Sequence, residues 1–323
     1  MMDAIGGYMS FDNMPGNHYH DTPFRFNSGR SALRFLINER GYRHIYLPLY
    51  MCDCVELLLK SIGTSYSFFP VGSDLLPNLE LQTKSDEAVF IVNYFGSLSY
   101  EDICGLKRKY GNIILDNTQA FFVKPVPNID TIYTARKFFG TSDGAYLFSD
   151  VSGSFYDSLP EDKSAEYTEY LFGRIEKGAE EYYTAFRKNE ERLDNPECRR
   201  MSASTDTLLR VMDYNSAIKK RKENFSQLDA CLSAINMLET VGYNGYFMYP
   251  LLVENGARLR AELIKRKIFI PCLWRNVLEH CPETSFEWNM AANCVMLPID
   301  QRYGSREMEY ICSQIREISQ EDK

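Results

Sequence analysis

Apolar segments of strand length alternate with helices through the first half of the chain, and this alternation limits the possible folds most strongly. The pattern is typical of a mostly parallel sheet covered by helices, so we predict an α/β fold. In such sheets ligands bind at the carboxyl ends of the strands. Strands are expected at residues 45–50, 64–71, 88–95, 112–116, 131–134 and 144–148, and helices from residue 28 onward and at 55–62 and 101–110.

The second half is more helical. Residues 161–192 are charged and helical, and a further helix is expected over residues 204–235. This helix carries the basic run Lys219-Lys220-Arg221-Lys222, which we interpret as a solvated helix face.

A smaller α+β domain is predicted at the C-terminal end. Its strands are expected at residues 247–253, 268–273 and 293–297, and its helices at 257–266 and 305–318. The predicted organisation is an N-terminal arm of residues 1–24, a large domain of residues 25–240 and a small domain of residues 241–323.

The composition argues against several classes of protein. A net charge of −8 and a pI of about 5.2 disfavour a nucleic-acid-binding surface. No apolar run approaches the roughly 18 residues of a membrane span, and the first 21 residues lack the pattern of a secretory signal. The nine cysteines are scattered and odd in number, which favours reduced thiols over a disulfide framework. We therefore expect a cytoplasmic protein that binds neither nucleic acid nor membranes.

Residues 113–144 place an acid and a lysine after two successive strands. Asp116 ends one strand, and Lys137 follows just past the next. Chemistry with pyridoxal 5'-phosphate (PLP) needs these two groups: a lysine that forms a Schiff base with the cofactor aldehyde, and a carboxylate that keeps the pyridinium nitrogen protonated. A capping acid and a surface lysine are the alternative interpretation, and the two residues alone leave it open.

The stretch Ser28-Gly29-Arg30-Ser31 is a candidate phosphate site. It is a turn of small residues before a helix, where backbone N–H groups meet the positive end of the helix dipole. Arg30 and Ser31 could add a charge and a hydroxyl group. The alternative is a plain helix cap by Ser28. Thr134 could supply a further hydroxyl group to the phosphate.

Other candidate side chains follow neighbouring strands. Gln119, three residues after Asp116, could hydrogen-bond the phenolic oxygen of the cofactor. Tyr94 ends another predicted strand, and Tyr50 and Cys52 follow a third. The aromatic rings could stack on the cofactor or belong to the core, and both interpretations stay open. With four histidines and no HExxH or CxxC motif, we expect no metal site.

Together these segments resemble the PLP-dependent fold type I aminotransferases of the DegT/StrS family, many of which aminate nucleotide-linked keto sugars. The resemblance runs over most of the chain. It is carried by residues 28–33 (SGRSAL, similar to S-G-T-x-A-L), 91–96 (IVNYFG, similar to V-x-H-x-Y-G), 115–120 (LDNTQA, similar to E-D-A-A-Q-A), 200–202 (RMS, similar to Y-R-M-S) and 297–300 (LPID, similar to an L-P-containing strand).

The resemblance implies roles for single residues. Asp116 would be the partner of the pyridinium nitrogen, Gln119 would contact the ring oxygen, and Lys137 would hold the cofactor. Residues 200–202 would reach the active site of a partner subunit, which implies a homodimer. The implied function is transfer of an amino group from glutamate to a keto sugar, nucleotide-linked in many members, by a ping-pong mechanism.

The chain departs from the family pattern at the cofactor. Arg30 replaces the threonine of the phosphate segment, and Thr134 would take the role of a serine that the family has further upstream. The stacking aromatic residue of the family falls at Cys52, which leaves Tyr94, Tyr50 or the thiol itself to pack on the ring.

These departures keep two alternatives open. One is a non-catalytic, PLP-binding regulator of the same fold, and the other is a PLP-dependent dehydratase or lyase. The presence of Lys137 favours transamination over dehydration, because the resembling sugar dehydratases have histidine in its place.

Overall fold

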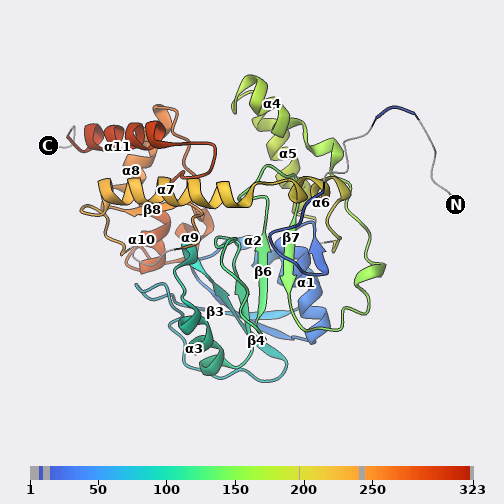
Figure 1. The fold of residues 1–323 in the computed structure, drawn as a ribbon. Helices are drawn as coiled ribbons and strands as arrows, with labels where there is room; N and C mark the ends of the chain where they lie inside the picture. Colours follow the sequence, from blue (N-terminus) through green and yellow to red (C-terminus); the bar gives the residue numbers. More distant parts are fainter. Residues whose placement is uncertain (1–6, 10–14, 196, 240–243, 321–323) are drawn as a thin grey trace.

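A seven-stranded sheet with the order β1-β7-β6-β5-β4-β2-β3 forms the centre of the large domain (Figure 1). The computed structural model describes residues 7–9, 15–195, 197–239 and 244–320. Strands β2 to β6 are parallel, and β7 pairs antiparallel with both β6 and β1. The predicted mostly parallel α/β fold is therefore confirmed. The strands are β1 (Phe24–Phe26), β2 (His44–Pro48), β3 (Ser65–Phe69), β4 (Glu87–Val92), β5 (Ile113–Asp116), β6 (Asp130–Thr134) and β7 (Ala145–Phe148).

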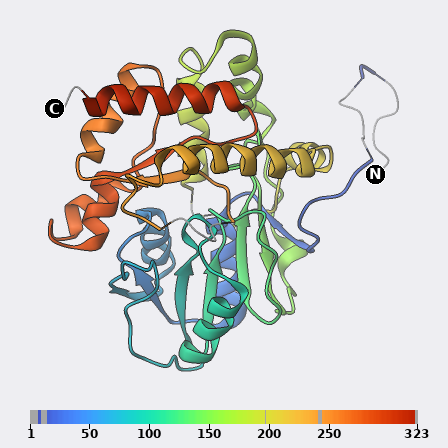
Figure 2. The same ribbon diagram turned by 60° about the vertical axis from the view of Figure 1, so that its left-hand side comes forward.

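Helices lie on both faces of the sheet (Figures 1 and 2). Several begin with a side chain that accepts from a free backbone N–H group, as Ser28 and Ser99 do. The helices of the large domain are α1 (Gly29–Arg40), α2 (Asp53–Ile62), α3 (Tyr100–Tyr110), α4 (Glu169–Lys177), α5 (Tyr183–Leu193) and α6 (Ala203–Arg210), with short 3-10 turns η1 (Tyr94–Gly96), η2 (Tyr156–Ser158) and η3 (Ala165–Tyr167).

Strand β4 shows why the central strands are so apolar. Val89 and Ile91 belong to the apolar cluster that contains α3, whereas Phe90 and Val92 belong to the cluster that contains α1 and α2. Successive residues of a strand point to opposite faces, so a sheet covered on both sides buries nearly every residue of such a strand.

The C-terminal part of the chain, predicted as a small domain, is a two-stranded antiparallel sheet packed among helices. The long helix α7 (Tyr214–Leu232) leads into it and packs against α11 (Ser305–Gln320). The remaining elements are β8 (Tyr249–Leu252), α8 (Gly256–Lys265), α9 (Arg275–His280), α10 (Phe286–Asn293) and β9 (Cys294–Leu297). The predicted domain boundary at residues 240–241 lies outside the described residues.

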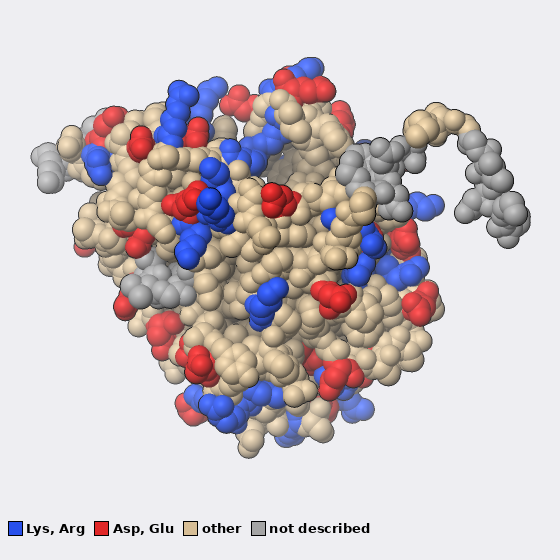
Figure 3. All heavy atoms as spheres, in the orientation of Figure 1, with Lys and Arg blue, Asp and Glu red and all other residues tan. Residues whose placement is uncertain are grey.

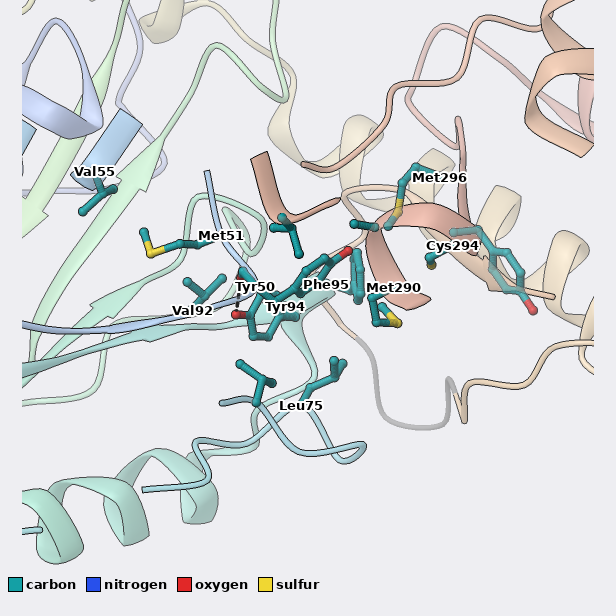
Figure 4. Close-up of a cluster of buried hydrophobic side chains, with 14 of the residues drawn as sticks. Tyr50, Met51, Val55, Leu75, Val92, Tyr94, Phe95, Met290, Cys294 and Met296 are labelled. Carbon is teal, nitrogen blue, oxygen red and sulfur yellow. Dashed lines mark hydrogen bonds between the residues drawn. The ribbon is translucent and has the colours of Figure 1, made fainter. Parts of the chain in front are cut away.

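The two domains share one apolar core (Figure 4). Tyr50 and Tyr94 of the large domain contact the same cluster as Met290, Cys294 and Met296 of the small domain. The small domain therefore packs closely against the ends of β2 and β4.

Two predicted elements were wrong. The helix expected over residues 204–235 is interrupted between α6 and α7, because the Asp213 side chain accepts from the Ser216 N–H at 2.9 Å and caps a new helix. The strand expected at residues 268–273 is irregular chain. Pro271 lacks the N–H group that a paired strand needs, and Lys267 has a left-handed φ of 62°.

The interpretation of residues 219–222 as a solvated helix face was wrong for one of its members. Lys219 and Lys222 are exposed, but Arg221 is buried with only 1% of its surface exposed. A single turn of helix points its side chains in different directions, so a run of like charges does not share one environment.

Charged side chains are mixed on the surface. On the face shown in Figure 3, basic and acidic groups are interspersed. Among the described helices, none combines the length and the apolar character that crossing a membrane requires.

Candidate active site

Two neighbouring parallel strands bring Asp116 and Lys137 to one edge of the sheet. Asp116 ends β5 and is paired with Ile132 of β6. The Asn117 N–H continues this pairing by donating to the Ile132 carbonyl at 2.8 Å. Strand β6 ends at Thr134, and Lys137 lies in the turn that follows. Because parallel strands end on the same side, both side chains lie at the carboxyl edge, where ligands bind in sheets of this kind.

Thr118 links the lysine to the acid. The Lys137 Nζ donates to Thr118 Oγ1 at 3.0 Å, and the Thr118 N–H donates to Asp116 Oδ1 at 2.8 Å. Thr118 was not among the residues predicted from the sequence. Its signal was the Asp-x-Thr spacing, because an aspartate at a strand end commonly accepts from the backbone N–H two residues further on.

The carboxyl group of Asp116 lies where burial opposes its charge. Burial raises the pKa of Asp116, while the positive charge of Lys137 and the hydrogen bonds from Thr118 act in the opposite direction. A cationic ligand group placed beside this carboxyl group would favour its ionised form. The site is therefore suited to a ligand with a protonated nitrogen.

The start of α1 at Gly29 lies next to these residues and, together with Thr134, forms a candidate phosphate site that we call the cradle. A side-chain carbon at Gly29 would lie 3.3 Å from Thr134 Cγ2 and 3.8 Å from Thr118 Cγ2, so both threonines converge on this glycine. Within the described chain, the buried Thr134 Oγ1 has no hydrogen-bond partner. A free hydroxyl group beside a helix N-terminus fits a phosphate, which accepts hydrogen bonds from both.

The side chains of Arg30 and Ser31 already have partners within the chain. The Arg30 guanidinium donates to Asp194 Oδ1 and to the Leu193 carbonyl, both at 2.6 Å. The Ser31 hydroxyl donates to Asn27 Oδ1 at 2.6 Å. The backbone at the start of α1 is thus a more direct source of phosphate donors than these two side chains.

Over 91% or 92% of its length the chain superimposes on solved aminotransferases, although no family model and no curated protein matches its sequence. A DegT DnrJ EryC1 StrS aminotransferase from Brucella abortus is 15% identical with a TM-score of 0.60, over 91% of this chain and 85% of that chain. The sugar aminotransferase CalS13 from Micromonospora echinospora is 13% identical with a TM-score of 0.62, over 91% and 86%. The PLP form of Spr1654 from Streptococcus pneumoniae is 14% identical with a TM-score of 0.65, over 92% and 87%. The chain therefore shares its fold with these solved structures.

Gln119 is buried behind the sheet edge. Only 2% of its surface is exposed, and its Oε1 accepts from the Phe95 N–H at 3.1 Å. This bond directs the carbonyl end of the amide toward η1 and leaves the amide NH₂ as the group that could donate to a ligand.

The candidate stacking residues Tyr94 and Tyr50 point into the core between the domains (Figure 4). The Tyr94 hydroxyl donates to the Tyr50 carbonyl at 2.5 Å, and the rings of Tyr50 and Trp274 lie 4.9 Å apart. Burial raises the pKa of both tyrosines well above the ordinary value. Their environment favours the core interpretation that the sequence left open.

Cys52 lies closer to the lysine. Its sulfur accepts from the Cys54 N–H at 3.4 Å and so caps α2. The thiols of Cys52 and Cys54 are half-buried, and the charge of Lys137 acts on both of them. The hydrogen bond between the two thiols raises the pKa of Cys52 and lowers that of Cys54. Of the candidate stacking groups, this sulfur is the one that shares its surroundings with Lys137.

The Arg-Met-Ser segment of the aminotransferase pattern lies beside the start of α1 in the same chain. The Asn27 N–H donates to the Arg199 carbonyl at 3.1 Å, and the Met201 N–H donates to the Arg25 carbonyl at 3.1 Å. The buried carboxylate of Asp143 accepts from the Ser202 N–H at 2.9 Å. The segment is thereby fixed next to the candidate phosphate cradle, and its predicted contact with a partner subunit stays a prediction.

Proposed function

We propose that this protein is a PLP-dependent aminotransferase that passes the amino group of glutamate to a keto sugar by a ping-pong mechanism. The observation that carries the proposal is the convergence of Lys137, Thr118 and Asp116 beside the cradle at Gly29 and Thr134. Spr1654 has been solved in PLP and PMP forms, and CalS13 is named a sugar aminotransferase, which supports the cofactor and the class of acceptor.

The residues present fit this cofactor. The backbone at Gly29 and the free hydroxyl group of Thr134 would hold the phosphate, and Asp116 would pair with the ring nitrogen. Gln119 would donate to the ring oxygen, and Lys137 would hold the aldehyde carbon. When bound, PLP supplies an electron sink for a negative charge at the α-carbon of an amino acid.

Lys137 is the residue that would move protons. Its Nζ, once free, would take a proton from the donor α-carbon as a general base and deliver it to the former aldehyde carbon of the cofactor as a general acid. Thr118 Oγ1 accepts a hydrogen bond from this Nζ at 3.0 Å and so keeps the free amine near the reacting carbon. Asp116 would hold its negative charge beside the ring nitrogen.

We also propose that the active protein is a cytoplasmic homodimer with its active site at the subunit interface. The resemblance of residues 200–202 to a segment that reaches a partner subunit supports the dimer. All nine cysteines are free thiols, which supports a reducing compartment. Sedimentation of the purified protein at several concentrations tests the dimer.

The function is tested by reductive trapping and by a half-reaction. Borohydride reduction of the protein with PLP, followed by mass spectrometry, should place the cofactor on Lys137. In a separate, unreduced sample of the PLP-loaded protein, addition of L-glutamate should yield 2-oxoglutarate and the amine form of the cofactor in equal amounts. Failure to trap Lys137 would overturn the proposal. Trapping without conversion by any amino donor would favour the regulator, and elimination from a substrate would favour the dehydratase or lyase.

A further inference from the structure

Arg221, in the middle of α7, is a buried cation whose partners are neutral. It is 1% exposed, and burial lowers the pKa of Arg221 to about 10, while the charge of Asp300 opposes that shift. Within the described chain its hydrogen-bond acceptors are three backbone carbonyls and one side-chain amide oxygen. Burying a guanidinium that has no hydrogen-bonded carboxylate lowers the free energy of unfolding. The burial of Arg221 therefore indicates a specific structural role at this place.

The guanidinium joins three separate segments. Its Nη1 donates to the Tyr246 carbonyl at 2.8 Å and to the Phe247 carbonyl at 3.3 Å, just before β8. Its Nε donates at 2.7 Å to Gln301 Oε1, which follows β9. Its Nη2 donates at 3.1 Å to the Phe138 carbonyl, which follows β6. The first two segments belong to the C-terminal domain, and the third contains Lys137.

The Phe138 carbonyl is held by two donors. Besides the Arg221 Nη2, the Gln301 Nε2 donates to this oxygen at 2.7 Å. The Arg221 guanidinium also lies 4.8 Å from the centre of the Phe138 ring. Because Arg221 and Gln301 are bonded to each other as well, the three groups form a closed ring of hydrogen bonds. We call this arrangement of Arg221, Gln301 and the Phe138 carbonyl the clamp.

The clamp acts on the residue next to Lys137. The backbone N–H groups of Phe138 and Phe139 both donate to the Ala135 carbonyl, at 2.8 and 2.9 Å, and close a tight turn that contains Lys137. The clamp fixes the peptide group that follows Phe138, so it restricts rotation of that turn. The clamp thereby also restricts the direction in which the Lys137 side chain leaves the backbone toward Thr118.

We infer that Arg221 and Gln301 are positioning residues for Lys137 and couple its orientation to the C-terminal domain. The inference rests on the proposed function, in which Lys137 must first meet the cofactor and then the donor α-carbon. Neither residue touches those groups, and each acts through the Phe138 carbonyl. A displacement of a reacting amine by about 1 Å can lower a rate about 100-fold.

The test measures how fast Lys137 is trapped in PLP-loaded samples by borohydride reduction and mass spectrometry. We expect Arg221→Met and Gln301→Ala to slow trapping, with a loss in kcat of about 10- to 100-fold for Arg221→Met and less for Gln301→Ala. The KM for the amino donor should stay near the wild-type value. Arg221→Lys, which keeps one donor and the charge, should recover part of the rate.

Arg260→Met is the matched control. Arg260 is a second buried arginine of the C-terminal domain, 9% exposed, and it donates to the Ala292 carbonyl away from Lys137. We expect this control to lose thermal stability but to trap Lys137 at the wild-type rate. Hydrogen exchange without cofactor gives an independent readout, because the Phe138 and Phe139 amides should exchange faster in Arg221→Met and Gln301→Ala but not in the control.

The outcomes distinguish a failure of the proposed function from a failure of the positioning inference. If the wild-type protein is never trapped at Lys137, the proposed function is wrong and the positioning role falls with it. If the wild type is trapped and the folded clamp variants are trapped at the same rate, only the positioning inference is wrong. Should Arg221→Met fail to fold, Gln301→Ala decides by itself, because Gln301 is only half-buried and supplies the shorter bond to Phe138.

Discussion

Two regions at the carboxyl edge of the same sheet differ in how deeply their candidate cofactor residues are buried. At the ends of β5 and β6, Asp116 is partly buried, Lys137 is exposed, and Thr118 connects them. At the ends of β2 and β4, Tyr50 and Tyr94 are enclosed in the core that the two domains share (Figure 4). Both regions follow parallel strands, and both carried candidate cofactor residues in the sequence.

The difference comes from what covers each region. Met290, Cys294 and Trp274 of the C-terminal domain pack on the tyrosines. The turn that contains Lys137, which we call the lysine turn, is instead contacted by polar groups, because Arg221 of α7 and Gln301 of the C-terminal domain both donate to the Phe138 carbonyl. A side chain that follows a parallel strand is therefore a candidate binding residue. Whether it can contact a ligand or is buried in the core depends on which residues pack over it.

The largest effect is expected for Lys137→Ala. We expect turnover to fall by at least about 1,000-fold, because the variant lacks the amine that holds the cofactor and transfers the proton. Steady-state kinetics and reductive trapping measure the loss. Lys222→Ala, which changes an exposed lysine of α7, should behave as wild type. Normal turnover by Lys137→Ala would show that the β5–β6 edge is not the active site.

Asp116→Asn should lower kcat by about 100-fold, since the amide cannot provide the charge beside the ring nitrogen. The variant should nevertheless stabilise the cofactor-free protein at neutral pH. A carboxyl group with a raised pKa binds more protons folded than unfolded, so the free energy of unfolding falls as pH rises through the raised pKa. Asparagine does not ionise, so in the variant this position no longer lowers the free energy of unfolding as the pH rises.

Denaturant titrations of cofactor-free wild type and Asp116→Asn across pH check the sign of this effect. The two curves should approach each other in acid and separate above the ordinary pKa range of aspartate, with the variant more stable. A variant that is less stable than wild type at neutral pH would contradict the assignment of burial as the dominant influence on Asp116.

Tyr94→Phe should act on stability. It leaves the buried Tyr50 carbonyl without the 2.5 Å hydrogen bond from the Tyr94 hydroxyl, at a cost of about 1–2 kcal/mol in the free energy of unfolding. The Kd for PLP should stay within about two-fold of wild type, because both rings belong to the core. Urea unfolding and fluorescence titration with PLP measure the two quantities. A large change in Kd without a change in stability would return Tyr94 to the cofactor site.

The smallest effect is expected for Cys52→Ser. Serine is a preferred helix cap and can accept from the Cys54 N–H as the sulfur does, so α2 should gain about 0.5 kcal/mol or less. If the Cys52 sulfur packs on the cofactor, the absorbance of the PLP-loaded protein should change as well. A stability gain with an unchanged spectrum would confine Cys52 to its capping role.

Much of the fold was predictable because its signals are local. Strands buried on two faces are apolar along their length, as β4 shows, and helices start at capping residues such as Ser28. The irregular chain at residues 268–273 was not predicted, because its apolar residues are typical of a strand and only Pro271, which lacks a backbone N–H group, indicated otherwise. Helices α9 and α10 were missed as well.

By itself the sequence determined the alternation of strand and helix and the order in which Asp116 and Lys137 follow successive strands. Parallel pairing then requires these two residues to share an edge. Only the tertiary structure decided that Tyr94 enters the core, that Thr118 connects the acid and the lysine, and that Arg221 hydrogen-bonds the Phe138 carbonyl in the turn that contains Lys137. The environment of each depends on partners far along the chain, such as Gln301 for Arg221, and no local pattern encodes such contacts.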